Sequence, residues 1–389
     1  MQIKRLIFLV LFLFYGVTVL PQQQLKSGEA DLESYRMYSE NKWNELLQFG
    51  KNTITSGIDF PLLRMRIGYA AFMLGNYSEC LKHYQSVLAQ NADNATALIY
   101  CYWSSYYLNN LSLARFYAGK MSPELRATEN IRSALISGVN LEYSFKSTDV
   151  SIRGNAQYVK MGMNVELGHQ LHLENNIALY NQIIQEPLFT AVTNNTNIQI
   201  AQKEFVTKLV YTASEKYQLI AGFHYLHTPF NNFLYRNYIG SAGVKYMMNY
   251  VQVQGFFQAG RIRDSTYTQA NAVISYFPKG NTNLYLVADL AVSKEPTLSQ
   301  TLGFRFNKKI SLEGRITGGA YYNLLSNDAL YVYDDIDLKK LRIGGSLYYM
   351  INKGCTFQCH YAFDRKELYQ RTGIYFNQHS ITGGIQWNF

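Results

Sequence analysis

The 389-residue sequence predicts a two-domain α + β protein: an N-terminal α-helical solenoid followed by an antiparallel transmembrane β-barrel of about 14 strands. Three observations predict this fold. A 34-residue period runs through residues 27–121, and a period of two replaces it from about residue 134. The last strand carries Ile385, Trp387 and Phe389 on one face. With no strand after it, it has to pair backwards, and closure onto the first barrel strand removes its open edge.

Residues 1–22 are typical of a secretory signal peptide. Lys4 and Arg5 precede an apolar run from Leu6 to Leu20, which is short for a helix that spans a bilayer. A retained inner-membrane anchor is the alternative. No later apolar stretch reaches helix-spanning length, so a membrane domain in this chain has to be a β-barrel, which satisfies every backbone amide within lipid.

Residues 23–132 are predicted to form a helical domain, because the segments Asn41–Trp43, Gly75–Tyr77 and Asn109–Leu111 recur at 34-residue spacing. The pattern is similar to the tetratricopeptide repeat, whose small residues let paired helices pack closely. It departs from that repeat at Ala92, which replaces the usual proline, and its first copy is degenerate. A helical hairpin bundle without repeats is the alternative. The residues of the repeat signature are Gly68, Ala71, Gly75, Tyr77, Cys80, Tyr84 and Ala114.

Residues 133–389 are predicted to form the barrel. In residues 310–316, for example, apolar side chains alternate with Ser311, Glu313 and Arg315. Such alternation indicates strands with one apolar and one polar face. Twelve or sixteen strands would fit the pattern with other boundaries. The fourteen predicted strands are 139–146, 155–168, 171–183, 198–212, 217–227, 238–248, 250–262, 266–277, 282–293, 298–307, 309–321, 338–351, 354–365 and 377–389.

The predicted connections alternate in length, which is typical of an outer-membrane barrel with both termini in the periplasm. Connections after even-numbered strands have one to four residues, and those after odd-numbered strands include four that are longer. The longer ones are expected to face outward and to carry a net negative charge. They are Pro187–Asn197, Thr228–Asn237, Tyr322–Asp337 and Lys366–Phe376, and their main acidic residues are Asp328, Asp334, Asp335 and Asp337.

The polar faces of the strands are predicted to line the lumen with charges of both signs. Such charges would line a hydrophilic channel, or they would pair and fill a narrow barrel that conducts nothing. The sequence leaves both alternatives open. The predicted lumen residues are Lys160, Glu166, Lys245, Asp289, Arg305, Glu313, Arg315 and Arg342, together with Glu142 and Asp364.

Charge and histidine content indicate neither nucleic-acid binding nor catalysis. The net charge is +9, but residues 21–132 hold 11 Lys/Arg against 10 Asp/Glu, and export would separate the protein from nucleic acid. His224 and His227 fall on opposite faces of a strand, and no histidine shows metal-ligand spacing. We therefore expect no enzymatic activity, no metal and no cofactor. The aromatic run at residues 100–107 would form a peptide groove or pack between helices.

The ending Gly384…Trp387-x-Phe389 resembles the C-terminal assembly signal of bacterial outer-membrane proteins. The resemblance implies insertion by the barrel-assembly machinery into the outer-membrane lipid of a Gram-negative bacterium. A repeat domain followed by a barrel resembles the YaiO-like outer-membrane barrel family, whose biochemical role is poorly defined. More distantly it resembles the exopolysaccharide secretins of cellulose and poly-N-acetylglucosamine systems, which have longer repeat arrays and a larger barrel. Length and domain order fit the YaiO-like family better.

These features predict an outer-membrane protein whose periplasmic repeats bind a protein or polysaccharide partner and whose barrel supports transport or export. The concave surface of a repeat stack suits such binding. The alternative is a non-conducting anchor that scaffolds an envelope or secretion complex. An outer-membrane enzyme is a third class, and no motif in the sequence supports it.

Overall fold

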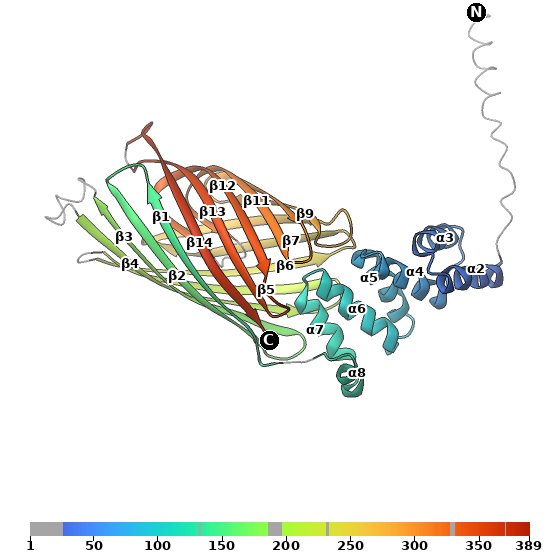
Figure 1. Ribbon diagram of the computed structural model, residues 1–389. Helices are drawn as coiled ribbons and strands as arrows, with labels where there is room; N and C mark the ends of the chain where they lie inside the picture. The colour runs from blue at the N-terminus through green and yellow to red at the C-terminus, as the bar shows by residue number, and fades with distance from the viewer. Residues whose placement is uncertain (1–25, 132–133, 186–196, 231–232, 327–330, 370) are drawn as a thin grey trace, which may run out of the picture.

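The computed structural model describes residues 26–131, 134–185, 197–230, 233–326, 331–369 and 371–389. Within these ranges, seven helices precede a closed antiparallel barrel of fourteen strands (Figure 1). The predicted two-domain fold is therefore confirmed. The predicted signal peptide, residues 1–22, lies outside the described residues. In the described part of the chain, no helix is long and apolar enough to cross a membrane.

The helical domain is a row in which each of the first five helices packs against the next. Corresponding helices of successive pairs begin 34 residues apart, so the period in the sequence matches helix pairs in the structure. The helices are α2 Ser27–Ser39, α3 Trp43–Thr55, α4 Pro61–Met73, α5 Tyr77–Leu88, α6 Ala95–Tyr107, α7 Leu111–Lys120 and α8 Pro123–Thr128.

Within each helix pair, the turn contains a residue in the left-handed conformation. Asn41, Gly75 and Asn109 have φ angles of 56°, 71° and 57°. Glycine and asparagine adopt this conformation at lower cost than other residues. The next residues in the second and third turns, Asn76 and Asn110, cap α5 and α7 by accepting a hydrogen bond from the backbone N–H three residues later. The recurring Gly/Asn pairs therefore end one helix and begin the next.

Several residues of the repeat signature lie where the helices pack together. Ala71, Cys80 and Tyr84 belong to one buried cluster, and Ala114 is also buried. A Cβ atom at Gly68 would lie 2.8 Å from the ring of Tyr84, so glycine at this position allows α4 and α5 to approach. Small residues here have a packing role.

The barrel closes through pairing of β14 with β1, as the sequence predicts, with Trp387 opposite Val139 and Ile385 opposite Leu141. Every other strand pairs with its neighbours in sequence. The strands are β1 Ile136–Thr148, β2 Arg153–Glu166, β3 Leu171–Gln185, β4 Asn197–Thr212, β5 Tyr217–Phe230, β6 Phe233–Met247, β7 Val251–Ile262, β8 Ser265–Tyr276, β9 Leu284–Val292, β10 Pro296–Arg305, β11 Ile310–Ser326, β12 Tyr331–Met350, β13 Cys355–Glu367 and β14 Tyr375–Asn388.

The outer surface of the barrel is apolar. On β1, Val139, Leu141 and Phe145 point outward and are each more than a third exposed. Trp387 and Phe389 continue this surface beside them, with exposed fractions of 50% and 69%. An apolar surface that encircles a barrel is the part that contacts lipid. The fourteen strands therefore span a membrane.

Two segments that the sequence predicts as long loops are largely strand, so that prediction is wrong. β5 and β6 extend into Thr228–Asn237, and β11 and β12 extend into Tyr322–Asp337. Backbone pairing continues there, as between Leu325 and Val332. In these extensions the alternation of apolar and polar residues fades, because it depends on one face of the strand contacting lipid. Backbone pairing does not depend on contact with lipid. Pro187–Asn197 lies almost wholly outside the described residues, as does Asp328.

Candidate functional site

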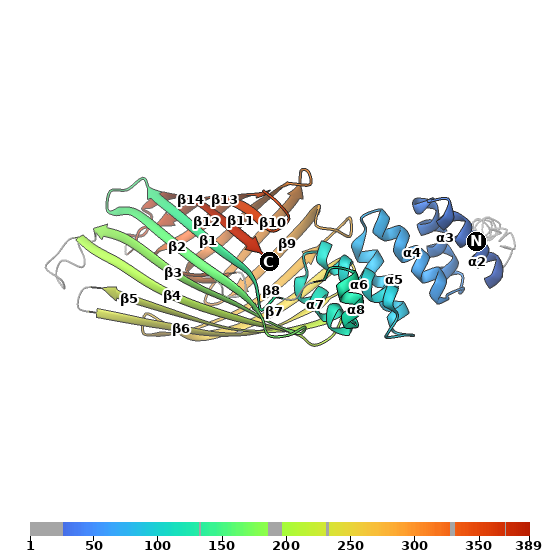
Figure 2. The same ribbon diagram turned by 60° about the horizontal axis from the view of Figure 1, so that its bottom comes forward.

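The helical domain and the C-terminus lie at the same end of the barrel, which we call the helix-side end (Figures 1 and 2). The opposite end, where β11 and β12 meet, is the far end. The strands enclose a lumen between these two ends, and its side chains form the candidate site.

Charged side chains on the wall of the lumen pair across neighbouring strands. Lys160 Nζ lies 2.8 Å from Glu142 Oε1, and Arg342 Nη1 lies 3.1 Å from Asp364 Oδ2. All four belong to the predicted lumen set, and each alternates along its strand with lipid-facing residues. Because these charges face one another inside the barrel, they neutralise each other in pairs.

Three more predicted lumen residues lie on the wall formed by β9 to β11. Arg315 Nη2 lies 3.7 Å from Asp289 Oδ2. Glu313 accepts hydrogen bonds from the hydroxyls of Tyr285 and Tyr348, the latter at 2.8 Å. The structure thus brings acid, base and phenol groups together on one side of the lumen.

The last two lumen predictions on the wall lie nearer the helix-side end. Arg305 is exposed, and its Nη2 donates to Thr282 Oγ1 at 3.3 Å. Lys245 is half-buried on β6, in register with Gln218 of β5 and Gln254 of β7. The remaining residue of the set, Glu166, contacts the helical domain instead.

At the helix-side end, the N-terminus of α5 rests on two turns of the barrel. Ser78 N donates to Gly280 O at 2.9 Å, and Asn281 Nδ2 donates to Gly75 O at 2.8 Å. Asn76 Nδ2 donates to the hydroxyl of Tyr250 at 3.1 Å. Gly280 has a φ of +63°, and a Cβ atom there would lie 1.9 Å from Asn76 Oδ1. The turn therefore requires glycine for this close contact.

The N-terminus of α7 makes an equivalent contact 34 residues later. Asn110 Nδ2 donates to Met247 Sδ at 2.8 Å, and Gln218 Nε2 donates to Asn110 Oδ1 at 3.2 Å. Met247 also joins the buried apolar cluster of the helical domain. The helix-capping asparagines thus also attach the domain to the barrel, a role that their spacing alone does not reveal.

Two ion pairs and a hydrogen bond extend this attachment along α7 and α8. Arg115 Nη2 lies 2.8 Å from Glu166 Oε1, at the end of β2. Lys120 Nζ lies 3.3 Å from Glu215 Oε1, and Arg126 Nη1 lies 2.9 Å from His169 Nε2. The helical domain therefore contacts the turns β2–β3, β4–β5, β6–β7 and β8–β9 and covers this side of the helix-side end.

A buried polar cluster supports the contact at α5. Glu79 accepts from Tyr250 at 3.0 Å and contacts His83 Nε2 at 3.2 Å, while Lys51 and Lys82 lie within 3.6 Å. Burial would raise the pKa of Glu79, but the hydrogen bond from His83 and the lysines outweigh it and lower that pKa to about 2. Burial also lowers the pKa of His83, against the attraction of Glu79. The cluster thus holds an ionised carboxylate at the domain boundary.

At the far end, β11 and β12 bend toward the lumen. Register shifts occur between Gly318 and Asn323, where Gly319 has a φ of +143°. Beyond the bend, the backbone of Leu325 exchanges two hydrogen bonds with the side chain of Gln269 on β8. The side chain of Leu325 packs in a buried cluster with Leu226, Ile239 and Ile262, from β5, β6 and β7. This hairpin therefore crosses the far end of the lumen.

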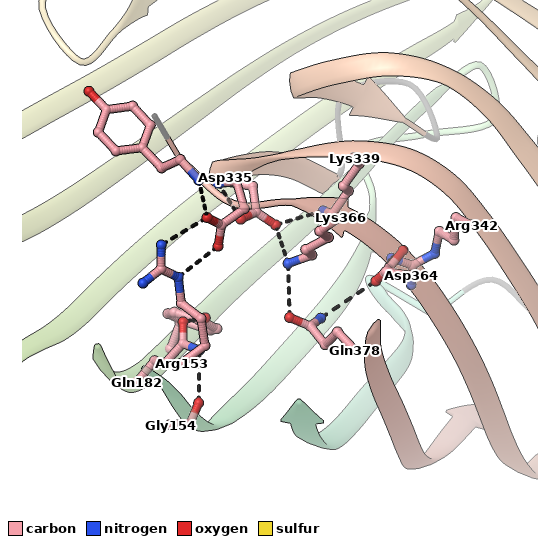
Figure 3. Close-up of polar contacts among 12 residues, drawn as sticks. Arg153, Gly154, Gln182, Asp335, Lys339, Arg342, Asp364, Lys366 and Gln378 are labelled. Atoms are coloured by element: carbon pink, nitrogen blue, oxygen red, sulfur yellow. Dashed lines mark hydrogen bonds and ion pairs between the residues drawn. The ribbon is translucent and has the colours of Figure 1, made fainter. Parts of the chain in front are cut away.

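Buried charges fix the other side of the hairpin (Figure 3). Arg153 binds Asp337 with two hydrogen bonds of 2.8 Å, and both side chains are 2% exposed. Asp335 Oδ2 lies 2.6 Å from Lys366 Nζ and 3.1 Å from Lys339 Nζ. The two aspartates were predicted to lie on an outward loop. They instead point to the barrel interior, because the segment continues as strand and their charge is matched by buried cations.

Between the two closures, the lumen contains a cavity of about 200 Å³ against the wall of β7 to β11. Its surface combines amide, hydroxyl and charged groups with one aromatic ring and two valines. The lining residues are Gln254, Phe256, Gln258, Asn271, Val273, Ser275, Val287, Asp289, Thr301 and Arg315.

Aromatic side chains cover one surface of the helical domain. The ring of Tyr77, from the repeat signature, stacks on Tyr107 at 4.8 Å between centroids, and Phe72 lies 6.0 Å from Tyr107. Trp103 contacts the same tyrosine at 6.1 Å. Tyr106 and Tyr107 are more than 40% exposed. The predicted aromatic run thus packs partly between helices and partly faces outward.

The three residues of the predicted assembly signal lie at the seam of the barrel. Trp387 and Phe389 face outward, and Phe389 N donates to Ser137 O at 3.0 Å. A Cβ atom at Gly384 would lie 2.9 Å from Glu142 Cγ on β1. Glycine therefore allows close approach at the seam, and the role of the ending in assembly stays a prediction. Among the residues that the structure describes, no group of three or more His, Cys, Asp and Glu could hold a metal ion.

No protein-family model matches the sequence, and no curated protein is significantly similar to it. Several solved structures match part of the chain at very low sequence identity. The TodX monoaromatic hydrocarbon channel deltaS2 mutant is 9% identical, with a TM-score of 0.44, and the match covers 70% of this chain and 94% of that one. A Pseudomonas aeruginosa FadL homologue is 8% identical, with a TM-score of 0.43 and coverage of 65% and 90%. A bacterial polysaccharide outer membrane secretin is 7% identical, with a TM-score of 0.40 and coverage of 66% and 100%.

Proposed function

We propose that this protein is a gated transport barrel in the outer membrane of a Gram-negative bacterium. One observation carries the proposal: a lipid-facing barrel of fourteen strands encloses a polar lumen, with the ends of β11 and β12 across one opening and the helical domain against the other. Barrels of about 8 strands have just enough room for their own side chains, whereas those of 16–18 strands leave a channel. A barrel of intermediate size needs additional elements to close it. Movement of such an element would open the lumen.

The helical domain is proposed to lie in the periplasm, after export directed by residues 1–22. The helix-side end carries both the domain and the C-terminus, and outer-membrane barrels keep their termini on the periplasmic side. The hairpin of β11 and β12 would then face the cell exterior. This orientation gives the two closures different environments and different potential regulators.

The helical domain is proposed to bind a periplasmic protein or polysaccharide. The 34-residue helix pairs support a tetratricopeptide-like stack, and the outward rings of Tyr106 and Tyr107 offer contact area at low entropic cost. A YaiO-like relationship remains part of this proposal. Binding at this surface would act on α5 and α7, which attach the domain to the barrel, and so on the helix-side closure.

A non-conducting anchor is the second candidate. The observation in its favour is the set of ion pairs that join neighbouring strands on the lumen wall, together with the elements that lie across the two ends. In that reading, the barrel holds the helical domain at the membrane as a scaffold.

Planar-bilayer conductance tests the two candidates. One variant, Asp335→Ala/Asp337→Ala, loosens the far end, and another, Asn76→Ala/Asn110→Ala/Arg115→Ala, loosens the helix-side end. We expect low current from the wild type and from each variant alone, and stable current from the combined variant. Silence of the combined variant, with folding confirmed by heat-modifiable migration, would contradict a gated channel and support the anchor.

A further inference from the structure

We propose that the cavity on the β7–β11 wall is a binding site for a small neutral polyhydroxylated solute, of the size of a single sugar ring. The inference deepens the proposed function and rests on it, because a solute site inside the lumen serves transport. It stands on the size of the cavity, its charge balance, an unpartnered buried acceptor, and the arrangement of its polar and apolar surfaces.

The volume of the cavity limits the size of the ligand. The cavity measures about 200 Å³, below the roughly 300–1,000 Å³ that is typical of pockets for drug-sized ligands. Five adjacent strands supply the lining, so the cavity belongs to the rigid wall and not to either closure. The ligand is therefore a small molecule, and a polymer would occupy the site with one unit at a time.

Charge balance makes the ligand neutral. Asp289 and Arg315 are the charged residues of the lining, and they face each other at 3.7 Å. Asp289 Oδ1 also accepts from Asn271 Nδ2 at 3.0 Å, and Arg315 Nη2 donates to Ser326 Oγ at 3.3 Å. Each charge thus has partners within the protein, and an ion in the cavity would meet no uncompensated counter-charge.

One lining residue carries a buried acceptor. Gln258 is 1% exposed, and its Oε1 has no hydrogen-bond partner among the described residues. A buried acceptor without a donor is costly, so the site favours a ligand that brings an O–H or N–H group. Thr301 and Ser275 add hydroxyls at other points of the lining.

The apolar part of the lining completes the match. Phe256 is 5% exposed and contributes an aromatic ring, and Val273 and Val287 extend that apolar surface. A sugar ring has C–H groups on its faces and hydroxyls around its edge. It can therefore contact Phe256 with a face while its edge reaches Gln258, Asn271 and Asp289. A purely apolar solute would leave these polar groups unpaired.

Calorimetric titration of the full-length protein in detergent tests the site. The probes are D-glucose, D-galactose and D-xylose, with glycine as a zwitterion and acetate as an anion. Titrations use the wild type and the Asp335→Ala/Asp337→Ala variant, so that access through the far end does not limit binding. We expect saturable binding of at least one sugar, with no heat of binding for glycine or acetate.

Variants of the lining provide the decisive comparison. Gln258→Leu and the milder Thr301→Val should weaken sugar binding at least fivefold. Gln358→Leu is the matched control, because Gln358 also faces the lumen but bonds Glu142 at 3.0 Å outside the cavity. Unchanged affinity in both lining variants, binding of glycine or acetate in preference to sugars, or no binding of any sugar would overturn the assignment. Sugar binding without current in the combined gating variant would keep the site and reject the channel.

Discussion

The two ends of the barrel are closed in physically different ways. The far end is crossed by the barrel's own strands and held by buried charges, such as the bidentate pair of Arg153 and Asp337. The helix-side end is covered by a separate domain, through neutral hydrogen bonds at Asn76 and Asn110 and through ion pairs at Arg115 and Lys120. One closure is continuous with the sheet, whereas the other is a docked surface.

This difference predicts that the two closures differ in stability. Removing one partner of a buried ion pair leaves an uncompensated charge and costs about 3–5 kcal/mol. A neutral hydrogen bond contributes about 0.5–1.5 kcal/mol, and docked domains within one chain resemble transient interfaces. The far end should therefore resist opening, and the helix-side end should exchange more readily. Binding of a partner to the helices would need to overcome only the weaker closure.

The largest effect should follow from breaking the far-end ion pair. Arg153→Ala leaves Asp337 buried without its bidentate partner, so the free energy of unfolding should fall by about 3–5 kcal/mol. Thermal unfolding followed by heat-modifiable migration measures the change. Arg261→Ala is the control, because Arg261 pairs with Asp264 in a contact where both side chains are at least half exposed. The control should change the free energy of unfolding by about 1 kcal/mol or less. Equal losses of stability in the two variants would contradict a stabilising role of the buried pair.

A smaller effect should follow at the helix-side end. Asn76→Ala and Asn110→Ala each remove a helix cap together with a contact to the barrel, whereas Asn94→Ala removes only the cap of α6. Each variant should lose about 1 kcal/mol of helix stability. Only the first two should also increase hydrogen exchange in the β6–β7 turn, which contains Tyr250. Increased exchange there in Asn94→Ala would mean that the caps act through the fold of the domain and not through docking.

The regular parts of the fold and the two closures differ in how well the sequence predicts them. The 34-residue period and the alternating strands predict the helix pairs and the fourteen strands, because both patterns repeat many times. The lumen residues follow from strand parity, so pairs such as Lys160 with Glu142 come from the predicted set. The bend at Gly319 does not follow, because it depends on long-range contacts of Leu325.

The acidic run at the far end shows why local patterns fail there. Asp335 and Asp337 have the composition of an exposed loop, and only their partners on β2, β12 and β13 make them interior residues. The docking role of Asn76 is hidden for a similar reason. Its spacing already has a sufficient explanation in helix capping, so nothing in the sequence signals a second partner.

The smallest predicted effect concerns pH at the docked surface. The folded pKa of Glu79 is about 2, below its ordinary value of 4.5, so its stabilising contribution is present above about pH 4.5 and is lost as pH falls from there toward 2. The lowered pKa of His83 acts in the same direction, because the unfolded state takes up a proton below about pH 6.5 more readily than the folded state does. Hydrogen exchange at α5 should therefore rise, after correction for its intrinsic pH dependence, as pH falls from 7 to 4.

Lys51, Lys82, Arg64 and Tyr250 also face this cluster. The variant Glu79→Gln/His83→Gln removes the carboxylate and the imidazole but keeps these neighbours. It should abolish the pH response of α5 and leave that of the far end unchanged. A response retained in this variant would show that other groups set the acid sensitivity of the helix-side end.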